Sequence, residues 1–313
     1  MNEFNVGVVI PCSENRLDNL KLVLQHLKVQ TFKPRSIVIV CDGFPPSKVS
    51  EYCGQEMSEI MLEGIQIQAT YNEKHVAGSG TIQPKNAGAW WFDNAKWSQQ
   101  PISHLWFIDS DIIVSPTTLE EYWNAEKQEF SWHEAAILNE RIQEPRIMIG
   151  PYEWLPIGRR QIDESLHNDP RGTFFQDFDP SYTSVGEINF ALANFGGNIV
   201  YPRQAFKDIG GFWDDLSAGR VEDGEIGLRC ASVGIPMCAA PNARGWHLEH
   251  PVNHQWKLET NEREVPMLNE RHPWVQQEGI YVSDNDGKRF EWIDPNTGIH
   301  HNTLEIWEHY TNE

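Results

Sequence analysis

The apolar residues in the first half of the chain form short runs that alternate with helical patterns. Leucines within 17–27 recur at the spacing of one helix face, directly after an apolar run. The predicted strands are 6–10, 36–41, 65–69, 104–108 and 146–150, and the predicted helices are 17–27, 86–97 and 115–126. Strands that alternate with helices predict an α/β fold with a mostly parallel sheet.

The second half of the chain is less regular. Residues 152–185 are rich in Pro, Gly, Asp and Arg, and predict a long loop or insertion. The elements predicted beyond it are strands 193–201 and 237–240 and helices 202–209 and 222–233. After about residue 251 the chain is polar and aromatic. Turn signals at 284–287 and 296–298 there predict a small hairpin.

The charge balance argues against two classes of partner. The 313 residues include 25 Lys and Arg against 45 Asp and Glu, a formal net charge of −20. Affinity for nucleic acid comes mainly from Lys and Arg that neutralise phosphates. Attachment to anionic lipid also needs a polybasic surface. The composition therefore makes a nucleic-acid or lipid-surface partner an unfavoured interpretation.

The five cysteines are odd in number and irregularly spaced, and no CxxC pair occurs. This pattern predicts free thiols in a reducing cytoplasm rather than a disulfide framework or a structural zinc site. No stretch of about 18 apolar residues is present, so no transmembrane helix is expected. The first apolar run is too short for a signal peptide.

Asp109, Ser110 and Asp111 directly follow the buried strand predicted over 104–108. Ligands of open α/β sheets bind at the carboxyl ends of strands. Two carboxylates one residue apart at such an end suit Mg²⁺ or Mn²⁺, which helps a diphosphate leave. The alternative interpretation is a plain turn in which Asp caps the backbone.

Two further polar segments lie where ligands bind in α/β folds. Asp42 ends the strand predicted over 36–41, where its carboxylate can bind a base or ribose. Lys85 and Asn86 open the next-to-last helix of this half, where a cation suits an anionic diphosphate. An Asp-Gly turn and an ordinary helix start are the alternatives.

The second half contributes two candidate groups. Glu222 and Asp223 begin a predicted helix, where acidic side chains complement the helix dipole. A carboxylate in a cleft can instead deprotonate a hydroxyl nucleophile. His247 and His250 can share one metal if the backbone between them is helical or tightly turned. Surface histidines are the alternative, since the chain holds 12 histidines.

Aromatic residues are abundant, with 13 Trp and an aromatic share of 11%. Aromatic faces suit sugar rings, since they offer apolar platforms with polar edges. Core packing is the alternative, and the sequence does not assign individual tryptophans to either role.

In their order along the chain, these segments resemble the GT-A fold of nucleotide-sugar glycosyltransferases. The likeness is greatest to family 2 and its relatives among the galactosyl- and N-acetylgalactosaminyltransferases. The similar segments are VVIPCSENRLDNLKLVLQHLKVQTFKPRSIVIVCDG, KNAG, DSD, FGGNIVYPRQAFKDIGGFWDD, VEDGEIGLRCASVGI and HLEH. The resemblance implies a catalytic domain over 1–254, with a nucleotide-sugar half over about 1–115 and an acceptor half over about 116–254. Residues 255–313 are expected to form a C-terminal appendage.

The resemblance also implies an activity, a metal-dependent and inverting transfer of a sugar from a UDP-sugar to a glycan or other hydroxyl acceptor. It assigns Asp223 as the general base and Glu222 to the acceptor. It assigns Mn²⁺ or Mg²⁺ to Asp111 with His247, His250 or both. The donor contacts that it implies are Pro11, Asp42, Lys85, Asn86, Asp109 and Ser110, with Asp42 on the base and Asp109 on metal or ribose.

Three alternatives remain open at this point. Transfer of sugar to hydroxymethylated bases of DNA is opposed by the net charge, although Arg159, Arg160 and Arg171 could form a local basic patch. A sugar-nucleotide-binding protein without turnover is opposed by the presence of Asp111, Asp223 and both histidines. A nucleotidyltransferase usually carries a Gly-rich basic loop near the first strand, and PCSENR contains no glycine.

Overall fold

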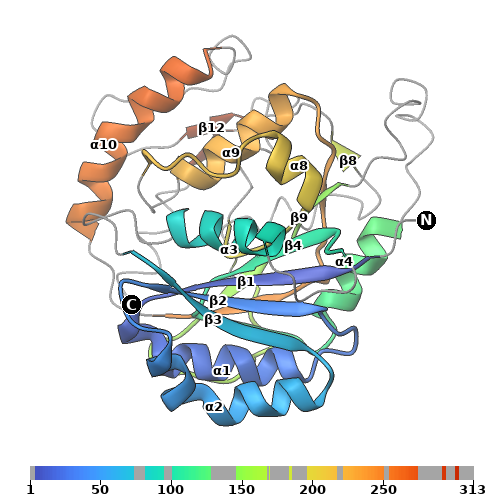
Figure 1. Cartoon of the computed structure of the whole chain (residues 1–313). Coiled ribbons are helices and arrows are strands. Elements are labelled where there is room, and N and C mark those ends of the chain that lie inside the picture. The colour runs from blue at the N-terminus through green and yellow to red at the C-terminus, as the bar shows by residue number, and fades with distance from the viewer. Residues whose placement is uncertain are drawn as a thin grey trace.

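The structure, a computed structural model, describes residues 4–73, 82–94, 101–127, 146–167, 169, 183–184, 196–216, 221–249, 254–273, 291–293 and 300–302. An eight-stranded sheet lies at the centre of the molecule (Figure 1). Its strands, in spatial order, are β3 (Gln66–Asn72), β2 (Ser36–Asp42), β1 (Val6–Cys12), β4 (His104–Ile108), β9 (Asn198–Pro202), β6 (Ile147–Ile149), β10 (Met237–Ala239) and β8 (Thr183–Ser184). β9 runs antiparallel to both neighbours and β8 to β10, while the other paired strands are parallel. The predicted α/β fold with a mostly parallel sheet is therefore confirmed.

Helices cover both faces of this sheet (Figure 1). On one face lie α1 (Leu17–Lys28), which follows the short 3-10 turn η1 (Glu14–Arg16), and α2 (Ser47–Leu62). On the other face lie α3 (Ile82–Asn94), α8 (Arg203–Asp208) and α9 (Val221–Ser232). α4 (Thr118–Lys127) follows the central strand β4 and the short strand β5 (Ile112–Val114) along the chain. The helix predicted over 86–97 thus begins earlier, at Ile82, and its residues 95–97 lie outside the described part.

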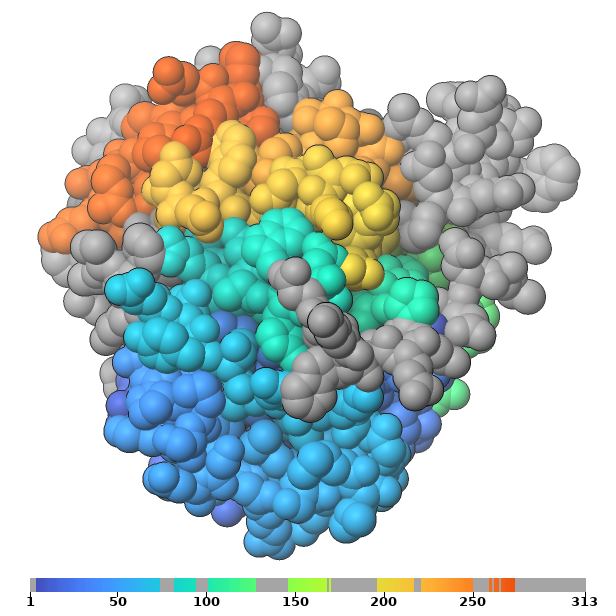
Figure 2. Space-filling model, in the orientation of Figure 1, coloured from blue at the N-terminus to red at the C-terminus, as the bar shows by residue number. Residues whose placement is uncertain are grey.

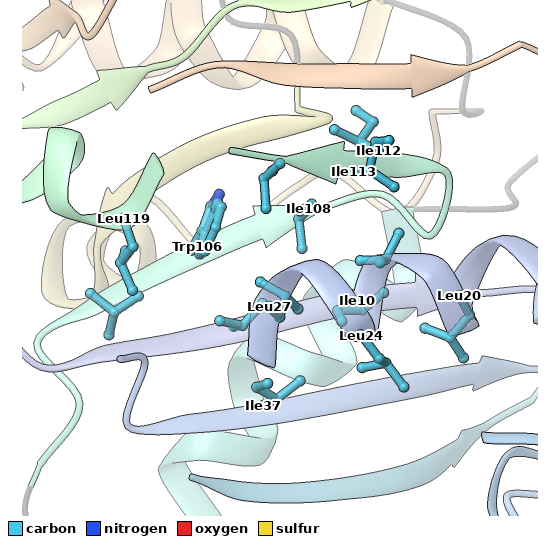
Figure 3. Packing of buried hydrophobic residues seen from close by; sticks show 14 of the residues in the cluster. Ile10, Leu20, Leu24, Leu27, Ile37, Trp106, Ile108, Ile112, Ile113 and Leu119 are labelled. Atoms are coloured by element: carbon cyan, nitrogen blue, oxygen red, sulfur yellow. The ribbon is translucent and has the colours of Figure 1, made fainter. Parts of the chain in front are cut away.

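The two faces of β1 contribute to different cores, as the period of two in a strand requires. Val8 and Ile10 pack with α1 and α2, whereas Val9 packs with the apolar residues of α3. Figure 3 shows Leu24 and Leu27 of α1 close to strand residues of the first core. Burial of an aliphatic side chain contributes about 1.5–3 kcal/mol, so this layer is a large part of the folding energy.

α3 approaches the sheet closely because a glycine faces it. A Cβ on Gly88 would lie 2.4 Å from Cγ1 of Val9 and 3.0 Å from Cγ2 of Val40. A larger residue would therefore push the helix away from the sheet. The close approach holds the first turn of α3, with Lys85 and Asn86, against the interior of the molecule, where both side chains are buried.

A second, three-stranded sheet lies beside the first, in the order β5 (Ile112–Val114), β11 (Gly245–Leu248) and β7 (Tyr152–Leu155). The prediction of a continuous loop over 152–185 is wrong at its start, because β7 pairs in parallel with β11. β8 also falls in that range and pairs with β10. The sequence of β7, YEWL, is short and flanked by Pro151 and Pro156, which is typical of a loop.

The C-terminal region contains a helix that the sequence pattern did not predict, α10 (His254–Arg271). α10 lies beside the segment 203–216 and α9 in both overall views (Figures 1 and 2). Beyond it, β12 (Glu291–Ile293) and β13 (His300–Asn302) pair antiparallel, in the region where turn signals predict a hairpin. The division into a catalytic domain and an appendage at residue 254 stays a prediction.

All five cysteines are buried free thiols, as predicted. Among the described residues, no helix has the length and apolar character needed to cross a bilayer.

Candidate functional site

Asp109, Ser110 and Asp111 form the turn between β4 and β5. The amide of Asp109 donates to the carbonyl of Gly197 at 3.2 Å, and the amide of Ile112 donates to the carbonyl of Asp109 at 3.1 Å. Ser110 and Asp111 are buried, while the side chain of Asp109 is 30% exposed. The turn therefore places two carboxylates at the carboxyl end of a central strand, the position expected from the sequence.

Asp111 lies between two basic side chains. Its Oδ2 is 3.3 Å from a guanidinium nitrogen of Arg16, and its Oδ1 is 3.7 Å from Nε2 of His247. The second contact follows from the small sheet, in which His247 is the cross-strand partner of Ile112. The amide of Leu248 also donates to the carbonyl of Asp111 at 2.7 Å. Two regions more than 130 residues apart in the sequence thus meet at one carboxylate.

Lys85, in the first turn of α3, brings a positive charge to the other side of the turn. Its Nζ lies 3.5 Å from Oδ1 of Asp109 and 3.9 Å from Oδ1 of Asp223. Its side chain is only 2% exposed. Burial lowers the pKa of Lys85, but the carboxylates of Asp109, Asp223 and Glu222 outweigh burial, and the net pKa lies above its ordinary value. Lys85 is therefore a permanent cation in contact with two candidate site residues.

Asp223 comes close to Lys85 because the backbone that passes between the two side chains has a glycine, Gly196, at this point. A Cβ on Gly196 would lie 2.3 Å from Oδ1 of Asp223 and 2.8 Å from Nζ of Lys85. A Cβ on Gly197 would lie 3.3 Å from Oδ2 of Asp109. A side chain at 196 would therefore separate the ion pair. The pair Gly196-Gly197, which lies within the strand predicted over 193–201, thus forms part of the site.

The pKa of Asp109 is raised to about 6, chiefly because its carboxylate is desolvated. Lys85 acts in the opposite direction, and the nearby carboxylates of Asp111 and Asp223 act in the same direction as the desolvation. The three carboxylates of Asp109, Asp111 and Asp223 outnumber the nearby Lys85, so the local electrostatic potential is negative. Such a site favours a cation or a cationic part of a ligand.

Asn86 has a structural task in this protein. Its amide Nδ2 donates to the carbonyl of Phe212 at 2.8 Å and to Oδ1 of Asp214 at 2.9 Å, and its Oδ1 accepts from the amide of Phe212 at 2.9 Å. These contacts fix the Gly-Gly-Phe-Trp turn that precedes α9. A role of Asn86 in donor binding stays a prediction.

The helix that carries Glu222 and Asp223 is held by a buried ionic network. Glu225, which is fully buried, accepts from Nε and a terminal nitrogen of Arg229 at 3.0 and 2.7 Å. Nε2 of His272, just after α10, lies 3.2 Å from Oε1 of Glu225. The guanidinium of Arg271 covers the ring of Trp213 at 3.7 Å. α10 therefore contacts both the turn before α9 and the helix itself.

The remaining predicted residues have different positions. Asp42 ends β2, which is separated from β4 by β1. Pro11, on β1, is the cross-strand partner of Val40 on β2. Glu222 is buried beside Asp223 in the first turn of α9. His250 lies outside the described residues. His247 is on a strand, so the helical or turned geometry expected for the His pair does not apply at its first member.

Three residues near the site were not identified from the sequence: Arg16, Tyr152 and Trp154. The ring of Trp154 lies 4.2 Å from that of His247, and the ring of Tyr152 lies 6.1 Å from it. The sequence could have identified Arg16, because it is a cation that follows the carboxyl end of β1 by four residues, and ligands bind at such strand ends. The alternation of YEWL was the only signal for β7.

The residues around Asp111 fit a divalent cation, although no group of three or more His, Cys, Asp or Glu among the described residues is arranged to hold a metal ion by itself. A carboxylate oxygen is a preferred ligand of Mg²⁺ and Mn²⁺, and an imidazole nitrogen lies beside it. The guanidinium of Arg16 lies beside Oδ2 of the same carboxylate, and the contact with His247 is to Oδ1. Two protein ligands leave further positions for water or a diphosphate, as is usual for Mg²⁺.

Several solved structures are similar to this chain. Among solved structures, GalNAc-T7 in complex with UDP, GalNAc and Mn²⁺ is 14% identical, with a TM-score of 0.50, over 89% of this chain and 57% of that chain. TarS of S. aureus is 16% identical, with a TM-score of 0.49, over 85% and 40% of the two chains. The mannosyltransferase PcManGT of Pyrobaculum calidifontis, in complex with GDP-Man and Mn²⁺, is 11% identical, with a TM-score of 0.48, over 83% and 62%. The chain thus spans about half the length of these structures.

The likeness to GalNAc-T7 is one of fold, and the predicted GT-A architecture is confirmed. No curated protein matches the sequence. The sequence profile of the family described as "Glycosyltransferase like family 2" matches residues 4–265, which include β1, both carboxylates after β4, the Gly-Gly pair, Asp223 and His247. The chain belongs to the glycosyltransferase-like family 2.

Proposed function

We propose that this protein transfers a sugar from a UDP-sugar to a hydroxyl group of an acceptor, with inversion at the anomeric carbon and with the help of Mn²⁺ or Mg²⁺. One observation carries the proposal. Asp109, Asp111 and Asp223 converge with Lys85 and His247, although these residues come from four distant parts of the chain.

The donor is expected to lie across the carboxyl ends of β2, β1 and β4. Asp42 at the end of β2 supplies an acceptor for the N–H of uracil. Asp109 at the end of β4 is placed for the ribose or the cation. The guanidinium of Arg16 lies beside Asp111 and supplies positive charge for the diphosphate.

Asp111 and His247 would hold the cation, which supplies stabilisation of the negative charge that develops on the leaving diphosphate. In the transfer itself, a carboxylate oxygen of Asp223 takes the proton of the acceptor hydroxyl. The hydroxyl oxygen forms the new bond to the anomeric carbon while the bond from that carbon to the diphosphate oxygen breaks. Lys85 holds Asp223 by its charge and fixes the direction of the carboxylate.

The substitution Asp223→Asn tests the assignment of the base. We expect transfer to fall about 100-fold to 10,000-fold, the usual contribution of a general base, while UDP affinity is retained. Asp208→Asn is the matched control, since Asp208 is an exposed residue of α8. Transfer that is unchanged in Asp223→Asn would sink the assignment. A wild-type protein that binds UDP but turns over no UDP-sugar would instead support a binding protein.

The acceptor class is tested by offering neutral glycans and hydroxymethylated DNA to the same preparation with a panel of UDP- and GDP-sugars. We expect transfer to the glycans and none to DNA, since the net charge of −20 repels the phosphate backbone. Transfer of sugar to the DNA and to none of the glycans would favour the DNA-modifying alternative. Release of a nucleotide only from GDP-sugars would contradict the assignment of the donor.

A further inference from the structure

One face of β7 is aromatic and partly open. Tyr152 and Trp154 are both half-buried and alternate with the fully packed Glu153 and Leu155. Because successive side chains of a strand point to opposite sides, the two rings share one face of the small sheet. His247, the cross-strand partner of Trp154, is on the adjacent strand β11.

The rings are held by a rigid support behind them. Glu153, 4% exposed, accepts from the guanidinium of Arg244 at 3.3 Å and from the amide of Asp169 at 2.8 Å. A carboxylate oxygen of Asp169 in turn accepts from the amide of Tyr152 at 2.9 Å. The first two residues of β7 are therefore tied to Asp169 and Arg244. A ligand that stacks on these rings would not have to order the strand first.

The rings of Tyr152 and Trp154 lie next to the residues that are proposed to bind the cation and the donor. Trp154 contacts the ring of His247, and His247 is 3.7 Å from Asp111. A Cβ on Gly197 would lie 3.3 Å from Cε1 of Tyr152 and 3.3 Å from Oδ2 of Asp109. The aromatic face thus adjoins the Asp109–Asp111 turn on the side of the small sheet. Asp42, the expected contact of the base, belongs to β2, two strands away from β4 in the large sheet.

We propose that Tyr152 and Trp154 form a platform for the sugar ring of the acceptor, an inference that rests on the proposed glycosyl transfer. The apolar face of a neutral pyranose stacks on aromatic rings, and the polar edges of Tyr and Trp meet its hydroxyl groups. The carboxylates of Asp109 and Asp111 lie beside the rings, and their negative charge disfavours an anionic acceptor. The acceptor class is therefore a neutral carbohydrate.

Labelling with 5-fluorotryptophan and ¹⁹F NMR tests the platform directly. The resonance of Trp154 is assigned with Trp154→Phe. The matched control is Trp123 of α4, which packs on Phe4 near the amino end of β4, and its resonance is assigned with Trp123→Phe. The probes are methyl galactoside, methyl mannoside and N-acetylglucosamine at millimolar concentration, in the presence of UDP and Mg²⁺. We expect the sugars to shift the Trp154 resonance and to leave that of Trp123 in place.

Affinity measurements on ring variants extend the test. Tyr152→Ala is expected to weaken binding of the same sugars about threefold to tenfold, the worth of one aromatic contact, whereas Tyr152→Phe keeps the ring and most of the affinity. If UDP binds to the wild type but no sugar moves the Trp154 resonance, the platform is wrong. A resonance that responds to a UDP-sugar and not to the free sugars would assign the rings to the donor and overturn the proposal. If UDP itself does not bind, the proposed function fails instead.

Discussion

The two ends of strand β4 both carry buried titratable groups, yet their surroundings differ. At the amino end, His104 is 3% exposed and its Nε2 lies 3.8 Å from Glu126. Phe4 packs against its ring at 4.7 Å, and Ser103 contacts Nδ1 at 2.9 Å. Burial lowers the pKa of His104 to about 4. Aromatic packing seals this end of the strand.

At the carboxyl end, the same strand leads into Asp109, whose side chain is 30% exposed. Lys85 and Asp223 reach it from α3 and α9. The comparison teaches that burial alone does not make a functional site. What distinguishes the carboxyl end is convergence of several elements on charges that remain accessible. Substitutions at the two ends should therefore affect activity and stability separately.

Among the substitutions that contrast the two ends of β4, the largest loss of transfer is expected from Lys85→Met. The change leaves Asp109 and Asp223 close together without the cation between them, so both carboxylates lose their orientation. We expect the rate of transfer to fall about 100-fold to 1,000-fold, the usual cost of losing one preorganised electrostatic partner. Initial rates with a UDP-sugar measure the effect. Lys28→Met, which removes an exposed ion pair with Glu59, is the control. A folded Lys85→Met protein with near wild-type rate would show that the convergence is not functional.

A smaller effect is expected from Asn86→Ala, which removes the contacts to Phe212 and Asp214. Leaving buried backbone groups without a partner costs about 1–3 kcal/mol in free energy of unfolding. Urea denaturation measures this loss. Transfer should also slow, because the released turn leads into the helix that carries Asp223. Asn19→Ala on α1 is the control, and equal stability of both variants would refute the role of Asn86.

The smallest effect on the rate of transfer is expected at the amino end of β4. There, Glu126→Gln should alter the free energy of unfolding but not the rate. Burial raises the pKa of Glu126 from its ordinary 4.5 to about 7, although Arg146 acts against this. Between these pH values the folded state binds the proton more tightly than the unfolded state. The wild type therefore loses stability from Glu126 as the pH rises from about 4.5 to 7.

His104 contributes with the opposite sign. Its folded pKa of about 4 lies below the ordinary 6.5, so stability is lost as the pH falls from about 6.5 to 4. The difference between Glu126→Gln and wild type isolates the Glu126 contribution. Relative to wild type, the variant should gain stability on the order of 1–3 kcal/mol between pH 5 and pH 8, at about 1.4 kcal/mol for each pKa unit. Urea midpoints at both pH values measure it, and a difference that does not change with pH would contradict the assignment.

The first half of the fold was predictable because its strands are continuous apolar runs. Residues 104–108 were predicted as a strand and form β4 with the same bounds. α2 escaped prediction because one position of its buried face is Glu56, which Gln25 and Lys21 contact. β7 escaped because half of its residues face the open side and prolines flank it.

The site was predictable only as far as strand ends reveal it. Asp109 and Asp111 follow a buried strand, so their common location at the sheet edge could be expected. The contact of Asp111 with His247 depends on a small sheet, and none of its three strands was predicted from the sequence. The role of Gly196 depends on a close approach of α3 and α9, which no local pattern encodes.

The central claim is that Asp111 and His247 make donor binding depend on a divalent cation. Isothermal titration calorimetry of UDP, with and without Mn²⁺, tests it on wild type, Asp111→Asn and the control Asp208→Asn. We predict that Mn²⁺ strengthens UDP binding at least tenfold, about 1.4 kcal/mol, in wild type and in the control but not in Asp111→Asn. Equal UDP affinity and equal response to Mn²⁺ in Asp111→Asn would contradict the account.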